Sequence, residues 1–131
     1  MVPPDAHKHV LVVDDDRAVL ALVTGWLKVA GYEVRPCDCF EDAKHVLTTT
    51  APSVLLADVR LGAFNGLQLV ILAKERNALT VPIVMSAFDD PALQREAAYC
   101  GATYLSKPFS REQVLAAVEA AMVGPIGDLT L

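Results

Sequence analysis

Five short apolar runs alternate with amphipathic stretches along the chain, and this alternation constrains the fold more than any other feature. The runs are His9–Val13, Tyr32–Cys37, Ser53–Ala57, Val81–Ser86 and Ala102–Ser106. The first, third and fourth are apolar without strict alternation, which is typical of parallel strands covered on both faces. The second alternates more and contains Pro36, so we expect it nearer an edge of the sheet.

Helical patterns fill the intervals between these runs. They are Arg17–Ala30, Phe40–Leu47, Gly66–Arg76, Pro91–Cys100 and a last helix that opens on the capping box Ser110–Gln113. The third pattern places Leu67, Val70 and Ile71 along one side of its helix. Strands and helices that alternate in this way predict right-handed crossovers and an α/β fold, a doubly wound parallel sheet with helices on both sides.

The length and apolar content predict a single domain. With 131 residues, of which 53% are hydrophobic, the chain can bury one good core. We assign residues 1–8 to an N-terminal tail, 9–123 to the domain and 124–131 to a C-terminal tail or the start of a linker. No apolar run approaches the roughly 18 residues that a membrane span needs, and the first residues lack a secretory signal pattern. We therefore expect a cytoplasmic protein without membrane contact.

Charge and cysteine content exclude two classes of function. The net charge is −5 and the eleven Lys and Arg residues are scattered, whereas nucleic-acid binding needs clustered cations. We therefore predict no direct nucleic-acid binding. Cys37, Cys39 and Cys100 lack zinc-site spacing, and we interpret them as small apolar residues in preference to part of a metal site.

Polar side chains stand where the predicted strands end. They are Asp14, Asp15, Asp16, Asp58, Ser86 and Lys107. In a doubly wound sheet the carboxyl ends of the strands meet at one edge, so these groups should converge. Each has a plainer interpretation taken singly: Asp14 to Asp16 as caps of the first helix, Asp58 as a turn residue and Lys107 as solvated surface, while Ser86 alone indicates nothing.

The combination predicts phosphoryl chemistry. Crowded carboxylates must share a proton or a cation, and hard oxygen ligands suit Mg²⁺. Lys107 and Ser86 could neutralise and bind phosphoryl oxygens, which is most of what phosphoryl transfer requires. Asp58 would then be the nucleophile that forms an aspartyl phosphate.

These residues resemble the receiver domain of two-component response regulators, of the chemotaxis-regulator type, from about Val10 to Met122. The matching motifs are Leu11–Asp15, Leu55–Leu61, Asn65–Leu67, Val84–Ala87 and Tyr104–Phe109. The resemblance implies a flavodoxin-like (βα)5 fold with five strands in the order 2-1-3-4-5.

The resemblance also implies a role for each site residue. Asp58 would accept a phosphoryl group from a histidine kinase or a histidine phosphotransfer protein. Asp14 and Asp15 would bind Mg²⁺ (or Mn²⁺) together with Asp58 and the backbone carbonyl of Arg60, with Asp15 as the more direct ligand. Lys107 would bind a phosphoryl oxygen, and the Lys107–Pro108 peptide bond would be cis.

Ser86 and Tyr104 resemble the coupled switch pair of the family, in which the hydroxyl moves toward the phosphoryl group and the ring turns inward. Tyr104 also has a plain alternative as an ordinary core aromatic. Arg60 and Phe88 stand where receivers carry side chains that influence the attacking water, and neither can act as a general base. A slow loss of the phosphoryl group is therefore expected.

The chain departs from the family pattern after Asp58. Gly62 stands where the family usually has proline, and Asn65 where it usually has aspartate. Without the restriction that proline imposes, the loop should be more flexible. No chemical group of the site is missing.

Two further functions compete with a phosphorylation-dependent signalling switch. A pseudo-receiver would keep the fold as a phosphorylation-independent interaction module, and the intact set of site residues argues against it. A flavodoxin-like cofactor carrier needs backbone donors after its first strand, where this chain has three aspartates, so we set that function aside.

The implied partners are the kinase or phosphotransfer protein and a downstream effector or output domain. A homodimer through the fourth helix, fifth strand and fifth helix is also possible in the family, and no enzyme activity on a separate substrate is expected.

Overall fold

The computed structural model describes residues 9–87 and 91–123, so both predicted tails lie outside the described residues. Five strands form one parallel sheet in the order β2-β1-β3-β6-β7. Their bounds are β1 His9–Val13, β2 Glu33–Cys37, β3 Val54–Asp58, β6 Val81–Ser86 and β7 Thr103–Ser106. Counted along the chain as the five strands of this sheet, they have the predicted order 2-1-3-4-5, and the α/β doubly wound fold is confirmed. The strand that contains Pro36 lies at an edge, as expected.

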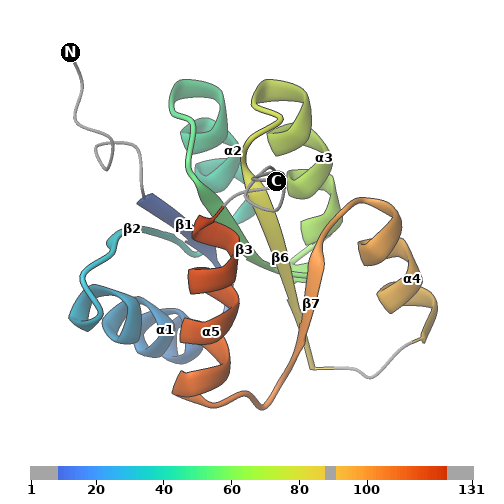
Figure 1. Cartoon of the computed structure of the whole chain (residues 1–131). Coiled ribbons are helices and arrows are strands. Elements are labelled where there is room, and N and C mark those ends of the chain that lie inside the picture. Colours follow the sequence, from blue (N-terminus) through green and yellow to red (C-terminus); the bar gives the residue numbers. More distant parts are fainter. Residues whose placement is uncertain (1–8, 88–90, 124–131) are drawn as a thin grey trace, which may run out of the picture.

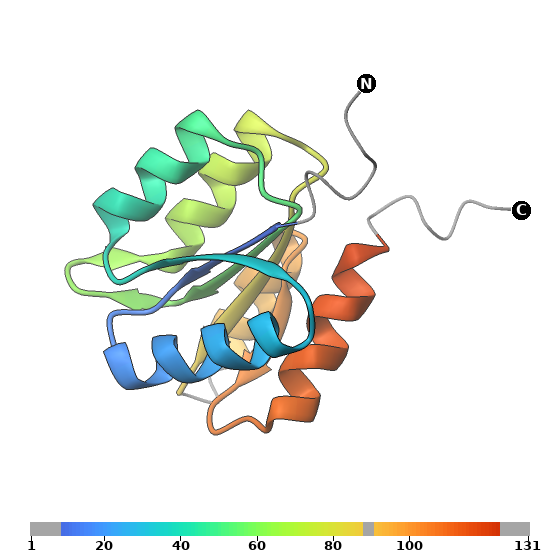
Figure 2. The same cartoon turned by 90° about the vertical axis from the view of Figure 1, so that its left-hand side faces the viewer.

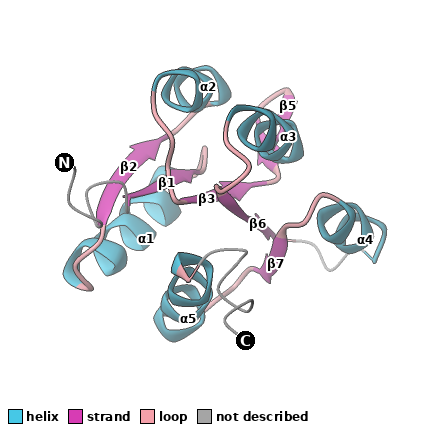
Figure 3. Ribbon diagram, turned by 45° about the horizontal axis from the view of Figure 1, so that its top comes forward, coloured by secondary structure: helices cyan, strands magenta, loops and turns pink. Residues whose placement is uncertain are grey.

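In the described part of the chain, five helices cover the two faces of the sheet. They are α1 Arg17–Val29, α2 Phe40–Thr49, α3 Gly66–Arg76, α4 Pro91–Tyr99 and α5 Arg111–Met122. Helices α1 and α5 lie on one face, and α2, α3 and α4 lie on the other (Figures 1 and 3). Figure 2 shows the sheet between these two layers. None of the described helices is long and apolar enough to cross a membrane.

The inner strand β1, between β2 and β3, divides its side chains between two hydrophobic cores. Leu11 and Val13 belong to the core under α2, α3 and α4, whereas Val10 and Val12 belong to the core under α1 and α5. All four are fully buried, because successive strand residues point to opposite faces and both faces are covered. Burying each such side chain contributes roughly 1.5–3 kcal/mol to the stability of the fold. The polar residues that follow this strand are therefore held on a rigid scaffold.

Side chains that cap the helices fix where α1, α3 and α5 begin. The Asp16 carboxylate accepts hydrogen bonds from the backbone N–H groups of Ala18 and Val19 at 3.0 and 3.2 Å. Asn65 and Ser110 each form a capping box with the glutamine three residues later. These caps satisfy donors that a helix N-terminus otherwise leaves free.

Helix α3 differs from its predicted packing. Leu67 and Val70 are buried as expected, but Ile71 is 50% exposed, so its predicted place on the apolar side was wrong. The buried residues of α3 include Leu69 and Ala73. The helix packs against both α2 and β3, which turns its apolar side toward α2 and leaves Ile71 in solvent.

A small β-hairpin follows β3 and was not predicted. Strands β4 (Arg60–Leu61) and β5 (Phe64–Asn65) pair antiparallel, with Arg60 opposite Asn65 and Leu61 opposite Phe64. Gly62 begins the two-residue turn with a φ of 61°, a conformation that glycine adopts without strain. The hairpin therefore gives the segment between Asp58 and α3 a defined shape.

Candidate functional site

Three carboxylates converge at the carboxyl edge of the sheet. Asp14 and Asp15 follow β1, and Asp58 ends the adjacent strand β3. One carboxylate oxygen from each lies within 4.8 Å of the others. This spacing and these oxygen donors fit a single hard divalent cation such as Mg²⁺.

Lys107, directly after β7, supplies the positive charge among these acids. Its Nζ lies 2.8 Å from Asp14 Oδ2 and 3.3 Å from Asp58 Oδ1. Lys107 thus pairs with two of the three carboxylates, and these four side chains together carry an excess of negative charge when all are ionised. The Lys107–Pro108 peptide bond is cis, as the resemblance implied.

Burial and charge shift the acid–base behaviour of the site. Burial, reinforced by the charge of Asp14, raises the pKa of Asp58 to about 6, against the opposing influence of Lys107. Burial lowers the pKa of Lys107, but its hydrogen bond to Asp14 and its attraction to Asp58 and Asp14 outweigh that effect. Its pKa therefore lies above its ordinary value. At neutral pH Lys107 is charged and Asp58 is mostly ionised, so a bound cation would relieve real repulsion.

Asp14 and Asp15 differ in exposure and in their partners. Asp14 is fully buried, and its oxygens accept from Lys107 Nζ and from the Asp16 backbone N–H at 2.8 and 2.9 Å. Asp15 is exposed, and its Oδ2 accepts from the Gly62 backbone N–H at 3.3 Å. Asp15 is thus the more accessible carboxylate, while Asp16 turns away to cap α1.

The other predicted site residues in the described part of the chain lie on β6, on β7 and in the hairpin after β3. Ser86 is 3% exposed at the end of β6, one residue beyond Met85, which lies opposite Asp58. Tyr104 lies on β7 and packs half-buried against the core under α4, a position compatible with both of its interpretations. Arg60 opens the hairpin close after Asp58. Phe88 lies outside the described residues.

Gly66 has a role that its motif did not reveal. As the first residue of α3, it donates its N–H to the Val59 carbonyl at 2.7 Å, and a Cβ on it would overlap the carbonyl oxygen of Asp58. Only glycine lets the helix approach the backbone of Asp58 so closely. A glycine at the first position of a well-capped helix, next to Asn65, is the sequence signal that could have indicated this approach.

Cys37 and Cys39 lie in different environments. Cys37 is buried in a hydrophobic core, which agrees with its interpretation as an apolar residue, and burial raises the pKa of its thiol to about 11. Cys39 lies near Asp38 and Asp42. However, Asp38 pairs with Arg17 at 3.1 Å, so this group is already partly neutralised.

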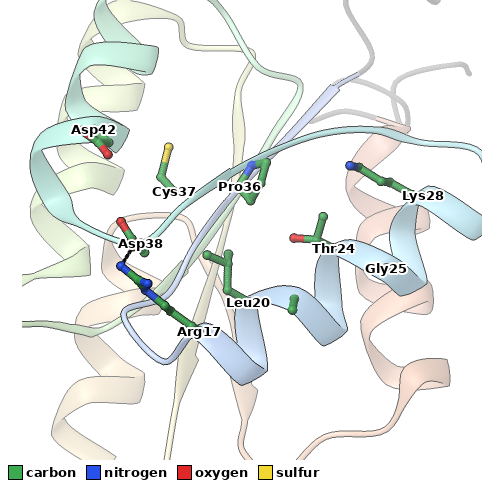
Figure 4. Close-up of a pocket in the computed structure, with 10 residues that line it drawn as sticks. Arg17, Leu20, Thr24, Gly25, Lys28, Pro36, Cys37, Asp38 and Asp42 are labelled. Carbon is green, nitrogen blue, oxygen red and sulfur yellow. Dashed lines mark ion pairs between the residues drawn. The ribbon is translucent and has the colours of Figure 1, made fainter.

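A groove of about 660 Å³ runs along α1 beside β2 and was not predicted. Figure 4 shows Leu20, Thr24 and Gly25 on its helical wall and Pro36 opposite, with the Arg17–Asp38 ion pair at one end. The Thr24 hydroxyl is buried and has no hydrogen-bond partner within the described part of the chain. None of Asp14, Asp15 and Asp58 lines this groove.

Comparison with known proteins identifies the family that shares these features. The model of the response regulator receiver domain matches residues 10–119. The DNA-binding transcriptional regulator NtrC of Salmonella typhimurium strain LT2 is 36% identical over 117 residues, which cover 86% of this chain and 24% of that protein. The chain thus spans about a quarter of the length of this relative.

Two solved structures share the fold and bear on the site. A Burkholderia pseudomallei response regulator with a phosphorylated aspartic acid, calcium ion and citrate is 27% identical, with a TM-score of 0.79 over 85% of this chain and 66% of that one. A beryllofluoride-activated NtrC4 receiver domain dimer is also 27% identical, with a TM-score of 0.82 over 88% of this chain and 96% of that one.

Proposed function

The chain belongs to the response regulator receiver domain family, and from this premise we propose that it is a phosphorylation-dependent switch of a two-component phosphorelay with Asp58 as its phosphoacceptor. The observation that carries the proposal is the ion-paired position of Asp58. It is a buried carboxylate beside two further acids, with Lys107 Nζ 3.3 Å from its oxygen. The phosphorylated aspartic acid of the Burkholderia relative supports the same chemistry.

The residues present fit a resident divalent cation. Asp14, Asp15 and Asp58 offer oxygens within 4.8 Å of one another, and the backbone carbonyl of Arg60 is the further ligand that the family resemblance supplies. Mg²⁺ (or Mn²⁺), when bound, would offset the negative charge that otherwise repels an anionic donor. The calcium ion of the Burkholderia relative supports a cation in this family.

The proposed reaction moves a phosphoryl group from a phosphohistidine of a histidine kinase or histidine phosphotransfer protein. An oxygen of the Asp58 carboxylate attacks phosphorus, the P–N bond breaks, and the imidazole nitrogen keeps the electron pair and takes up a proton. Lys107 neutralises one phosphoryl oxygen and the Ser86 hydroxyl donates to another. Later attack by water restores the carboxylate and releases phosphate. The domain thus assists its own phosphorylation and hydrolysis and acts on no separate substrate.

The signal would leave the site through Ser86 and Tyr104. When Ser86 moves toward the phosphoryl group, Tyr104 can turn inward and change the surface formed by α4, β7 and α5. Phosphorylation shifts the population of this surface only by the free energy of the new contacts. We propose that a downstream effector, an output domain or a second copy of the chain recognises it, in the cytoplasm and without direct nucleic-acid contact by this domain. The NtrC4 receiver dimer supports the last of these partners.

A phosphodonor experiment tests the central claim. The purified chain is incubated with acetyl phosphate and Mg²⁺, and intact mass spectrometry should show the added mass of one phosphoryl group. Asp58→Asn and chelation by EDTA should each abolish the addition. A wild-type chain that never incorporates phosphate would favour the pseudo-receiver, and so would an Asp58→Asn chain that still responds to the donor.

A further inference from the structure

The hairpin after β3 contacts the carboxylate cluster through its turn. The Gly62 backbone N–H donates to Asp15 Oδ2 at 3.3 Å, across a separation of 47 residues along the chain. Asp15 is exposed, and an exposed carboxylate otherwise exchanges freely among rotamers. The Gly62 amide therefore restrains one oxygen of Asp15, and the other oxygen stays available.

An aromatic pair supports this hairpin from the side of α2. The rings of Phe40 and Phe64 stack with their centroids 4.4 Å apart and their planes inclined by 11°. Phe40 is the first residue of α2 and packs against a hydrophobic core. Phe64 pairs across the hairpin with Leu61, which is 3% exposed. The turn at Gly62 is thus fixed between a buried strand residue and an anchored ring.

Neighbouring negative charges oppose the position in which the Gly62 amide holds Asp15. A recess of about 260 Å³ beside the hairpin is lined by Asp15, Asp38 and Glu41 together with Phe40 and Phe64. Carboxylates that face one recess repel each other, and the pairing of Asp38 with Arg17 removes only part of that repulsion. Without a donor from Gly62, Asp15 would gain by turning further into solvent.

We propose that Phe64 and Phe40 are positioning residues for the cation site. Their stack holds the hairpin where the Gly62 amide orients Asp15 toward the oxygens of Asp14 and Asp58. The proposal rests on the proposed function, because it assumes that these carboxylates bind Mg²⁺. Partners that orient a metal ligand without touching the metal commonly change affinity by about tenfold or more when they are removed.

Calorimetric titration with Mg²⁺ tests the proposal directly. Phe64→Ala and Phe40→Ala should each weaken Mg²⁺ binding by about tenfold, and the double variant should be little worse than either single variant, because both remove the same stack. Phe64→Tyr keeps the stacked ring and should restore near wild-type affinity. Leu79→Ala is the matched control: it shortens an apolar side chain that is 59% exposed, before β6 and thus at the other end of that strand.

A second readout separates positioning from stability. The Gly62 amide resonance should lose its protection against hydrogen exchange in Phe64→Ala, in protein without Mg²⁺, and keep it in Leu79→Ala. Unchanged Mg²⁺ affinity in Phe64→Ala would overturn the positioning role and leave the proposed function intact. A wild-type chain that binds no Mg²⁺ would overturn both. Equal weakening by Leu79→Ala would show a general loss of stability and would also overturn the positioning role.

Discussion

At the scale of single residues, Asp58 combines two properties that oppose each other. Its carboxylate must be ionised to act as a nucleophile, yet it lies 6% exposed beside Asp14. The pKa of Asp58 is raised to about 6, so without a cation the folded chain holds a proton there more tightly than the unfolded chain does. The stabilisation from this proton is complete below the ordinary pKa and is lost as pH rises through 6.

The substitution Asp58→Asn should therefore stabilise the cation-free protein at pH 7. The gain is at most about 3 kcal/mol in the free energy of unfolding, and it should shrink toward zero as the pH falls to 4. Urea denaturation in EDTA at several pH values measures this difference between variant and wild type. Glu119→Gln removes an exposed carboxylate on α5 and should show no comparable gain. A variant that is less stable than wild type at pH 7 would contradict the argument.

Gly66 gives a prediction with a matched control in the same chain. Gly66→Ala should lower the free energy of unfolding by about 1–3 kcal/mol, the usual effect of overpacking, because the new methyl group overlaps the Asp58 carbonyl oxygen. Gly25→Ala makes the same change within α1, where a Cβ meets nothing within 4 Å. It should stabilise by about 0.5–1 kcal/mol. Urea denaturation of both variants measures the contrast, and equal effects would argue against the close approach at Gly66.

The side chains at the strand ends could be predicted from the sequence because the order of strands brings them together. Asp58 ends one strand, and Asp14 and Lys107 directly follow two others. A doubly wound sheet leaves the carboxyl ends of these strands at one edge. The Gly62 donor could not be predicted in this way, because a backbone N–H is present in every residue except proline. Its direction depends on a turn conformation that becomes clear only in three dimensions.

At the scale of elements, comparison with the family pattern did not predict the conformation of the hairpin β4–β5. The presence of Gly62 in place of proline predicted only a more flexible loop. In the structure Gly62 has a φ of 61°, which proline cannot adopt because its ring fixes φ near −65°. The stack of Phe64 on Phe40 joins two segments that no periodicity relates, so sequence patterns carried no sign of it.

Introducing the proline that the family usually has at position 62 should therefore destabilise this chain. Gly62→Pro removes the N–H that Asp15 accepts from and forces the turn to open, so we expect it to reduce both Mg²⁺ affinity and the free energy of unfolding. Gly62→Ala keeps the N–H and should cost only about 1–2 kcal/mol for the left-handed conformation. Thermal unfolding and Mg²⁺ titration of the two variants measure the difference. A proline variant as stable as wild type would show that the hairpin is not required.

At the scale of the whole molecule, the edge of the sheet formed by β7 is only partly covered. The edge strand β7 has no fully buried residue, and α4 buries only Ala97 among the residues described. Tyr99 on α4 is 94% exposed. The face formed by α4, β7 and α5 therefore includes a large ring on α4 that its own domain leaves uncovered. From the sequence, only the family resemblance indicated this face as a contact surface. The pattern of residues could not predict that Tyr99 is exposed, because its exposure depends on how α4 is oriented.

Activation should convert this face into a dimer contact. Beryllofluoride with Mg²⁺ mimics the phosphorylated state, and light scattering should then show twice the 14.0 kDa mass of the single chain. Because a ring this exposed gains most from being covered, Tyr99→Ala should weaken the activated dimer, with an effect of about 2 kcal/mol or more if the ring is a central contact. Leu79→Ala shortens an exposed side chain in the segment before β6, outside α4, β7 and α5, and should leave the dimer unchanged. An activated chain that binds beryllofluoride and stays at 14.0 kDa would contradict the dimer while leaving Asp58 as the phosphoacceptor, and the same surface would then serve a different partner.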